Sequence, residues 1–212
     1  LCLPMIGFGQ QTYVPDDNFE AYLEANGMGN GIANDDFVTT ANINTVDTLY
    51  VNNQSITNLT GIEDFTALTF LDCSSNNWQL TSLDVSNNTA LTSLNCNDNN
   101  ITNLDVSGAT ALTFLDCSNN PLSSLSIYNN TALTTLVCHD NDIYFLNLNF
   151  NLALITLDCS SNNIANLDVS NNTALTSLNC NDNNITNLDV SNNTALTSLN
   201  CNNNHITNLD VS

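Results

Sequence analysis

The sequence contains no lysine and no arginine, whereas it has 21 aspartate and glutamate residues and a formal net charge of −21. Binding to nucleic acid depends on cationic side chains that neutralise phosphates, so the composition argues against a nucleic acid partner. An anionic membrane surface would repel the chain for the same reason. The hydrophobic content of 42% over 212 residues is nevertheless ordinary for a folded protein with one core.

Long hydrophobic runs and catalytic motifs are also missing. No segment after the N-terminus approaches the ~20 apolar residues of a membrane span, so we expect no membrane insertion. The two histidines, His139 and His205, are three repeats apart, and the sequence has no HExxH pair and no Gly-x-Ser-x-Gly elbow. Without Lys and Arg, the usual clamps for oxyanions and phosphates are absent too. The sequence therefore predicts no enzymatic activity and no cofactor.

Residues 1–11 form an apolar run that ends in small residues and does not begin with Met. Such a run is typical of the end of a signal peptide whose cationic start is missing. We expect residues 1–11 to be a signal peptide remnant, cleaved between Gly9 and Gln11, and the protein to be secreted or held at the cell surface. A buried N-terminal strand is the alternative interpretation.

Seven similar units follow one another over residues 66–212, and the last is truncated at Ser212. The units begin at Thr66, Thr89, Thr110, Thr131, Leu152, Thr173 and Thr194, so the first spacing is 23 residues and the other five are 21. An atypical unit occupies residues 46–65. Self-similarity at this period predicts a solenoid of stacked repeats, with residues 12–45 as an N-terminal cap.

The repeat resembles the leucine-rich-repeat family. The family signature L-x-x-L-x-L-x-x-N-x-L is present as Leu91-Thr-Ser-Leu94-Asn-Cys96-Asn-Asp-Asn99-Asn-Ile101, with Cys in place of the third Leu. The resemblance covers residues 46–212, and residues 14–65 resemble the N-terminal cap of bacterial secreted and surface members. This resemblance implies adhesion at a surface or recognition of a protein.

The alternation of residues within one unit predicts the same fold independently. Leu94 and Cys96 alternate with Ser93, Asn95 and Asn97, which is the pattern of a short strand with one face inward. Stacked copies would form a parallel sheet, on the concave face, with strands ~4.8 Å apart. Because 21 residues leave no room for a full helix, the convex side should be extended or 3₁₀, with Leu104 and Val106 pointing inward.

The cap should contain a short helix over residues 16–26. Asp16 is a suitable N-cap, and Gly27 follows the expected end of the helix. Phe19, Tyr22 and Leu23 recur at helical spacing and should cover the first repeat.

Two residue types recur once in each unit. The strand pattern turns the cysteines inward, where free thiols behave as small hydrophobes; a disulfide or metal role is the alternative. The asparagines follow each strand, and their amides should satisfy backbone groups of neighbouring turns. The columns are Cys73, Cys96, Cys117, Cys138, Cys159, Cys180 and Cys201, and Asn76, Asn99, Asn120, Asn141, Asn162, Asn183 and Asn204.

Outward positions of the strands should form the ligand-binding face. Carboxylates alternate along each of two columns, and the two columns are out of phase, which suits a cationic or hydroxyl-rich surface better than a calcium cage. On the same face, two phenylalanines, a valine and a histidine take the place of the small polar or acidic residues found in other units. The candidate contacts here are Phe70, Asp72, Asp98, Phe114, Asp116, Val137, His139, Asp140, Asp158 and Asp182.

A third column and a group of aromatic residues leave alternatives open. Asp168, Asp189 and Asp210 are neighbours in successive units, and either backbone N–H groups or bridging cations such as Ca²⁺ could satisfy them. Aromatic residues replace small polar ones in the middle units, and they mark either a binding site or harmless variation. These further contact candidates are Tyr128, Tyr144, Phe145 and Phe150.

The sequence therefore predicts a non-enzymatic extracellular binding module that recognises a protein or a glycan at the cell surface. A structural spacer within a larger surface protein is one alternative, and a calcium-stabilised repeat array is another. We expect the module to be monomeric within a longer chain.

Overall fold

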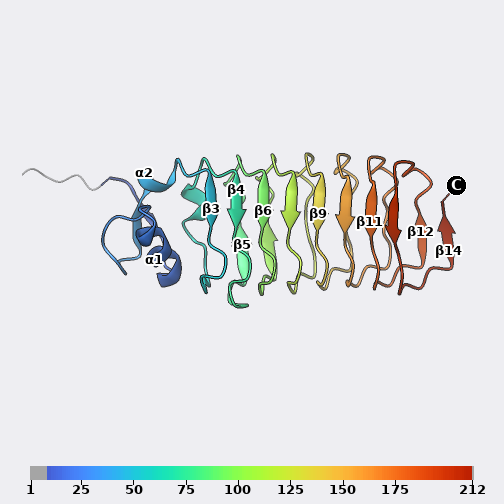
Figure 1. Cartoon of the computed structure of the whole chain (residues 1–212), viewed down its shortest axis with the longest axis horizontal. Helices are drawn as coiled ribbons and strands as arrows, with labels where there is room; N and C mark the ends of the chain where they lie inside the picture. Colours follow the sequence, from blue (N-terminus) through green and yellow to red (C-terminus); the bar gives the residue numbers. More distant parts are fainter. Residues whose placement is uncertain (1–8, 212) are drawn as a thin grey trace, which may run out of the picture.

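The computed structural model describes residues 9–211, which form an elongated stack of turns with a helical cap at one end (Figure 1). One side of the stack carries an eight-stranded parallel sheet, hereafter the main sheet. Each strand has three residues, and its middle residue is Leu. In spatial and chain order the strands are β3 (Thr48–Tyr50), β4 (Phe70–Asp72), β6 (Ser93–Asn95), β8 (Phe114–Asp116), β9 (Thr135–Val137), β10 (Thr156–Asp158), β11 (Ser177–Asn179) and β13 (Ser198–Asn200).

The register of the main sheet follows the repeat without a slip. Leu94 of β6 pairs with Leu115 of β8, and the other strands pair in the same way, so each outward column runs straight along the stack. Equivalent residues in consecutive units are therefore neighbours in space. The parallel sheet predicted from the alternation of Leu and Cys with polar residues is confirmed.

The opposite side of the stack, hereafter the return side, is extended, as expected, but it also contains two short parallel pairs. These are β5 (Ser82–Asp84) with β7 (Asn103–Asp105), and β12 (Asn187–Asp189) with β14 (Asn208–Asp210). Between the two pairs, residues 124–126, 145–147 and 166–168 run in the same direction without forming strands. A 3₁₀ helix, η1 (Ile62–Asp64), precedes the first complete repeat.

The core lies between the two sides and is continuous along the stack. Most turns contribute Leu and Cys from the main-sheet side and Leu with Val or Ile from the return side; Val51 replaces the Cys in the first turn, and Leu148 replaces the Val or Ile in a middle one. Leu104 and Val106 point inward as predicted, with exposed fractions of 8% and 0%. No single turn could enclose these side chains by itself, so each depends on its two neighbours.

The helix α1 (Asp17–Ala25) confirms the short helix that was predicted for the cap. The Oδ1 atom of Asp16 accepts the N–H groups of Asn18 and Phe19 at 3.1 and 2.9 Å, and Phe19 and Leu23 are completely buried. The other oxygen of Asp16 accepts the backbone N–H of Thr57 at 2.8 Å, which ties the cap to the first repeat. One carboxylate therefore caps the helix and docks it.

A small antiparallel sheet and a one-turn helix complete the cap. Strand β1 (Gln11–Tyr13) pairs with β2 (Phe37–Thr39), and α2 (Thr40–Ile43) follows directly. The backbone N–H of Thr40 donates to the carbonyl of Gln10 at 2.9 Å. Gln10 and Gln11 are therefore part of the folded cap, although the sequence placed them in the signal peptide remnant; residues 1–8 of that segment lie outside the described residues.

Candidate binding faces

The repeated cysteines are free thiols, and six of the seven are buried, while Cys201 is half-buried. Burial raises the pKa values of the six buried thiols, with Coulomb repulsion from neighbouring Cys or Asp residues as a lesser cause; for Cys180 the pKa rises to about 12. A thiol that stays protonated is neither a nucleophile nor a metal ligand. The prediction that this column belongs to the core is confirmed.

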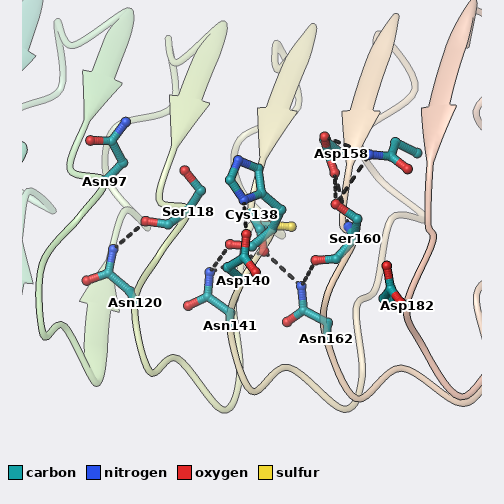
Figure 2. A network of polar contacts seen from close by, with 12 residues as sticks. Asn97, Ser118, Asn120, Cys138, Asp140, Asn141, Asp158, Ser160, Asn162 and Asp182 are labelled. Carbon is teal, nitrogen blue, oxygen red and sulfur yellow. Dashed lines mark hydrogen bonds and ion pairs between the residues drawn. The ribbon is translucent and has the colours of Figure 1, made fainter.

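The asparagine that follows each main strand has a structural role, as predicted. The Nδ2 group of Asn120 donates to the carbonyls of Cys96, Cys117 and Ser118 at 3.0–3.2 Å, and its Oδ1 accepts the N–H of Ile101 at 2.9 Å. Asn141 and Asn162 repeat the pattern along the row in Figure 2. These amides join consecutive turns where the chain leaves the main sheet.

A second asparagine column was missed by the sequence analysis, although it recurs at the same period, in Asn-Asn-Thr segments for every member except Asn151. Its members are buried where the chain leaves the return side, and the Nδ2 of Asn130 donates to the carbonyls of Val106 and Ala109 at 2.9 and 2.8 Å. In five members the Oδ1 atom is buried without a partner. The members are Asn88, Asn130, Asn151, Asn172 and Asn193, and Ala109 takes the place of one.

The first column of predicted acidic contacts lies on the main sheet, as expected. Asp72, Asp116 and Asp158 are the last residues of their strands and are half-buried. Asp158 accepts the N–H and the Oγ–H of Ser160 through Oδ1, and its Oδ2 accepts Asn179 Nδ2 at 3.0 Å (Figure 2). These bonds fix the carboxylates in one orientation before any ligand arrives.

The second acidic column is not on the strands. Asp98, Asp140 and Asp182 occupy the turn after each strand, and the prediction that they are strand positions is wrong. Every residue of this column has a left-handed backbone, with φ between 50° and 55°. Asn and Asp tolerate this conformation better than most residues, so the backbone accounts for five of the seven residues in this column, the other two being Ser75 and Ser161. Asp140 and Asp182 are nevertheless exposed.

The two columns together place one carboxylate on each of six consecutive turns. Asp72, Asp116 and Asp158 alternate with Asp98, Asp140 and Asp182 along strands β4 to β11, so neighbouring charges are never in the same column. The Nδ1 atom of His139 lies 2.7 Å from Asp140 Oδ2, and its side chain is 29% exposed. We call this row of carboxylates the acidic edge.

The predicted aromatic contacts on the main sheet sit near the cap. The ring of Phe70 lies 5.1 Å from that of Tyr50, centroid to centroid, whereas Phe114 is separated from Phe70 by Ser93. Tyr50 is 54% exposed and was missed because its repeat is atypical. Val137 is half-buried beside Asp116 and Asp158 in the strand register.

The carboxylates of the return side bind their own turns. Asp168 Oδ1 accepts the N–H and Oγ–H of Ser170 at 3.0 and 2.6 Å, and Asp189 bonds Ser191 in the same way. The serine hydroxyl, and secondly the backbone N–H, lower the pKa of Asp168. These contacts favour the interpretation in which backbone groups satisfy the column, and calcium binding by Asp168, Asp189 and Asp210 stays an untested prediction.

Over residues 9–211, the three carboxylates that lie close enough to share an ion belong to the cap: Asp17, Glu20 and Asp36. Glu20 is completely buried, and its oxygens already accept the N–H groups of Asp35 and Asp36 at 3.1 and 3.2 Å. The group is therefore accounted for by the hydrogen bonding of the cap loop.

The aromatic residues of the middle units gather on the return side, away from the acidic edge. Tyr128 and Phe150 form a T-shaped pair with centroids 4.4 Å apart. Tyr144 and Phe145 are 64% and 59% exposed, and with Tyr128 they line a shallow groove of about 360 Å³. The contact residues predicted from the sequence therefore lie on two different faces, the main-sheet side and the return side.

Comparison with known proteins identifies the repeat. Residues 39–143 match the family of the leucine-rich-repeat domain of the endo-β-N-acetylglucosaminidase EndoS. The functional domain of InlJ from Listeria monocytogenes, which includes a cysteine ladder, is 40% identical, with a TM-score of 0.70; the match covers 98% of this chain and 51% of that one. No curated protein matches the chain.

Two further solved structures share the fold at low identity. Internalin C2 of Listeria monocytogenes is 20% identical, with a TM-score of 0.60, and the match covers 94% of this chain and 92% of that one. The leucine-rich-repeat protein LIC12759 of Leptospira interrogans is 19% identical, with a TM-score of 0.56, over 72% of this chain and 50% of that one.

The chain spans about half the length of the InlJ domain. Within residues 9–211, no helix is long and apolar enough to cross a membrane.

Proposed function

We propose that this chain, which belongs to the leucine-rich-repeat family, is a non-enzymatic extracellular binding module whose main sheet recognises a protein with a basic surface. The observation that carries the proposal is the acidic edge, a row of six carboxylates on six consecutive turns in a chain without Lys or Arg. A partner with cationic side chains at matching intervals would be attracted and oriented by this row.

The spacing of the acidic edge suits an extended partner surface. Turns of a parallel solenoid are ~4.8 Å apart, so carboxylates in one column are ~10 Å apart, which is about one Debye length at physiological ionic strength. Their mutual repulsion is then only ~0.4 kcal/mol in water. The row can therefore hold a high negative charge in the free state at little cost, and it would be neutralised in the complex.

A catalytic role has no support among the described side chains. The buried cysteines have raised pKa values, and the hydrogen-bond partner of the His139 ring is the carboxylate of Asp140 rather than a hydroxyl or a thiol. The location at a cell surface or outside the cell is part of the proposal and rests on the kinship with internalin-type proteins.

The proposal is tested with a triple variant of the second acidic column, Asp98→Asn, Asp140→Asn and Asp182→Asn. Asn119 and Asn203 occupy the same column with the same backbone conformation, so the variant should fold normally. Surface plasmon resonance would compare a panel of basic secreted proteins with a matched acidic panel. We expect binding of basic proteins to weaken about tenfold or more in the variant and to lose part of its salt dependence.

A control variant changes three exposed, uncharged residues in the turns next to the acidic edge, Asn100→Ser, Asn163→Ser and Asn184→Ser. It keeps the charge of the chain unchanged and should bind as the original does. If no basic protein binds, or if the carboxylates can be removed without effect, the proposed role of the acidic edge is wrong.

A further inference from the structure

The groove on the return side differs from the rest of the molecule in charge. In the column that ends each return segment, the residues are Asp84, Asp105, Ser126, Asn147, Asp168, Asp189 and Asp210. The two neutral members, Ser126 and Asn147, are the two that line the groove beside Tyr128, Tyr144 and Phe145. The groove is thus an uncharged site in a chain of net charge −21.

The fold does not require this loss of charge. Asn147 Oδ1 accepts the N–H of Asn149 at 3.0 Å, just as Asp105 Oδ1 accepts the N–H of Ser107 at 2.8 Å, so either residue type closes the turn. Repulsion between neighbours does not require it either, because Asp168 and Asp189 occupy consecutive turns. The neutral residues therefore need another explanation, and the aromatic residues beside them offer one.

The polar groups in the groove are available to a ligand. The hydroxyls of Ser124 and Ser126 and the Nδ2 of Asn147 make no hydrogen bond within residues 9–211, and all three residues are exposed. The backbone here is also unpaired, because residues 124–126 and 145–147 do not form the strand pairs seen in β5–β7 and β12–β14. Aromatic rings and unpartnered hydroxyl and amide groups thus meet in one hollow.

We propose that this groove is a second binding site, which takes an uncharged saccharide. The C–H faces of a pyranose would pack on the rings of Tyr144 and Phe145, while its hydroxyls bond Ser124, Ser126 and Asn147. Phe145 also lines an adjoining hollow of about 220 Å³ that continues along the stack to Asn166 and Asn187 and includes one carboxylate, Asp168. A linear oligosaccharide could therefore follow the stack across several turns.

The size and charge of the groove favour a saccharide over a protein. A hollow of about 360 Å³ is within the range of small-ligand sites, whereas a stable protein interface needs ~800 Å² from each partner. A basic protein would be attracted by the Asp of the regular repeats. In the groove, that Asp is replaced by Ser126 and Asn147. An anionic ligand would be repelled by the chain as a whole.

The test uses the full chain and four uncharged hexasaccharides, namely cellohexaose, maltohexaose, xylohexaose and chitohexaose, with hexalysine as a cationic comparison. Isothermal titration calorimetry would be run on the double variant Tyr144→Thr, Phe145→Asn. Thr102 and Asn103 are the equivalent residues of a regular unit, so this variant should fold normally. We expect at least one hexasaccharide to bind, and its affinity to fall about tenfold or more in the variant, because both rings on which the sugar would stack are removed.

Two further variants sharpen the result. Ser126→Asp restores the carboxylate of the regular repeat, and it should weaken saccharide binding several-fold while strengthening that of hexalysine. Trp78→Asn removes an exposed aromatic residue outside the groove and should leave saccharide binding unchanged. Circular dichroism and the unfolding midpoint would verify that each variant is folded.

The inference rests on the proposed binding role of the chain but fails separately from it. If no hexasaccharide binds, or if the double variant binds it as well as the original does, the saccharide site is wrong, whatever the acidic edge does. If the double variant instead loses a basic protein found with the main sheet, the groove is part of a protein interface and the inference is overturned. If the acidic-edge variant alone fails to change protein binding, only the role of that edge is lost.

Discussion

The main sheet and the return side are built from the same repeat, yet they tolerate variation differently. The main sheet is continuous from β3 to β13, whereas strand pairing on the return side is interrupted from residue 124 to residue 168. On the main-sheet side, each strand from β4 to β13 is followed by an asparagine whose Oδ1 and Nδ2 both bond backbone groups of the preceding turn. On the return side, Ala109 takes the place of one asparagine, and aromatic residues replace small polar ones in the middle units.

This comparison indicates where the chain can change without losing its fold. The hydrogen bonds that hold the stack together are concentrated where the chain leaves the main sheet, so the return side is free to carry a local site. Four sets of variants or conditions test this division, beginning with the largest expected effect.

The thiols of the main-sheet side should make the protein unstable in alkali. Burial raises the folded-state pKa values of the six buried thiols above the ordinary value of 9.0. The thiols are therefore protonated in the folded protein and ionised after unfolding at high pH. Stability is fully present below pH 9 and falls as the pH rises toward the folded pKa values, by about 1.4 kcal/mol per pH unit for each buried thiol.

Urea unfolding between about pH 8 and pH 10.5 would measure this loss, since that range brackets the ordinary pKa of a thiol. Replacing Cys96 and Cys138 by Val should reduce the pH slope by about 3 kcal/mol per pH unit, because two of the buried thiols are removed. A slope that is unchanged in this variant would show that the thiols do not determine the alkaline limit.

The two asparagine columns should differ in their contribution to stability. Asn120→Ala leaves three carbonyls and the N–H of Ile101 without this partner, and we expect a loss of about 3 kcal/mol in the free energy of unfolding. Asn130→Ala removes two donor contacts and also an oxygen that has no partner, so it should cost about half as much.

Denaturant titration of both variants would measure this difference, with the exposed Asn100→Ala as a control that should change stability by less than about 0.5 kcal/mol. Equal losses for the two buried asparagines would contradict the division between the two sides.

In the second acidic column, substitutions should change stability through the backbone conformation and not through the charge. Asp98→Ala places a residue with an ordinary Cβ at a φ of 53°, and it should lower the free energy of unfolding by about 1 kcal/mol. Asp98→Asn should leave stability almost unchanged, because Asn119 has the same conformation in the next unit. Chemical unfolding of the pair separates the two contributions, and a large effect of Asn would show that the charge itself stabilises the turn.

The smallest effect is expected on the return side. Phe145→Asn introduces the residue that the next unit has at this position, Asn166, and Phe145 is 59% exposed, so stability should change by no more than about 0.5 kcal/mol. A thermal melt would detect a larger loss. Such a loss would mean that the aromatic residue is needed for packing and would weaken its assignment to a binding site.

Much of the fold could be predicted because the repeat fixes it in two ways. The alternation around Leu94 and Cys96 indicated the strand and its inward face, and the recurrence of Asn99 located the turn. The left-handed conformation at Asp98 could not be read from the strand pattern, because a polar residue at that position fits either an exposed strand or a turn.

The candidate site was harder to predict than the fold. Tyr128 and Phe145 were recognised as departures from the repeat, but which side they occupy depends on the path of the chain after each strand. Tyr50 was missed since its unit matches the repeat poorly, and the neutral residues Ser126 and Asn147 gain meaning only beside the aromatic groove.

The most direct test of the account is a crossed binding measurement on the two faces. A basic protein ligand and an uncharged hexasaccharide, each identified as above, would be titrated into both the acidic-edge variant and the Tyr144→Thr, Phe145→Asn variant. We predict that the first variant loses only the protein and the second loses only the saccharide. Loss of both ligands in either folded variant would contradict the assignment of separate sites to the main sheet and the return side.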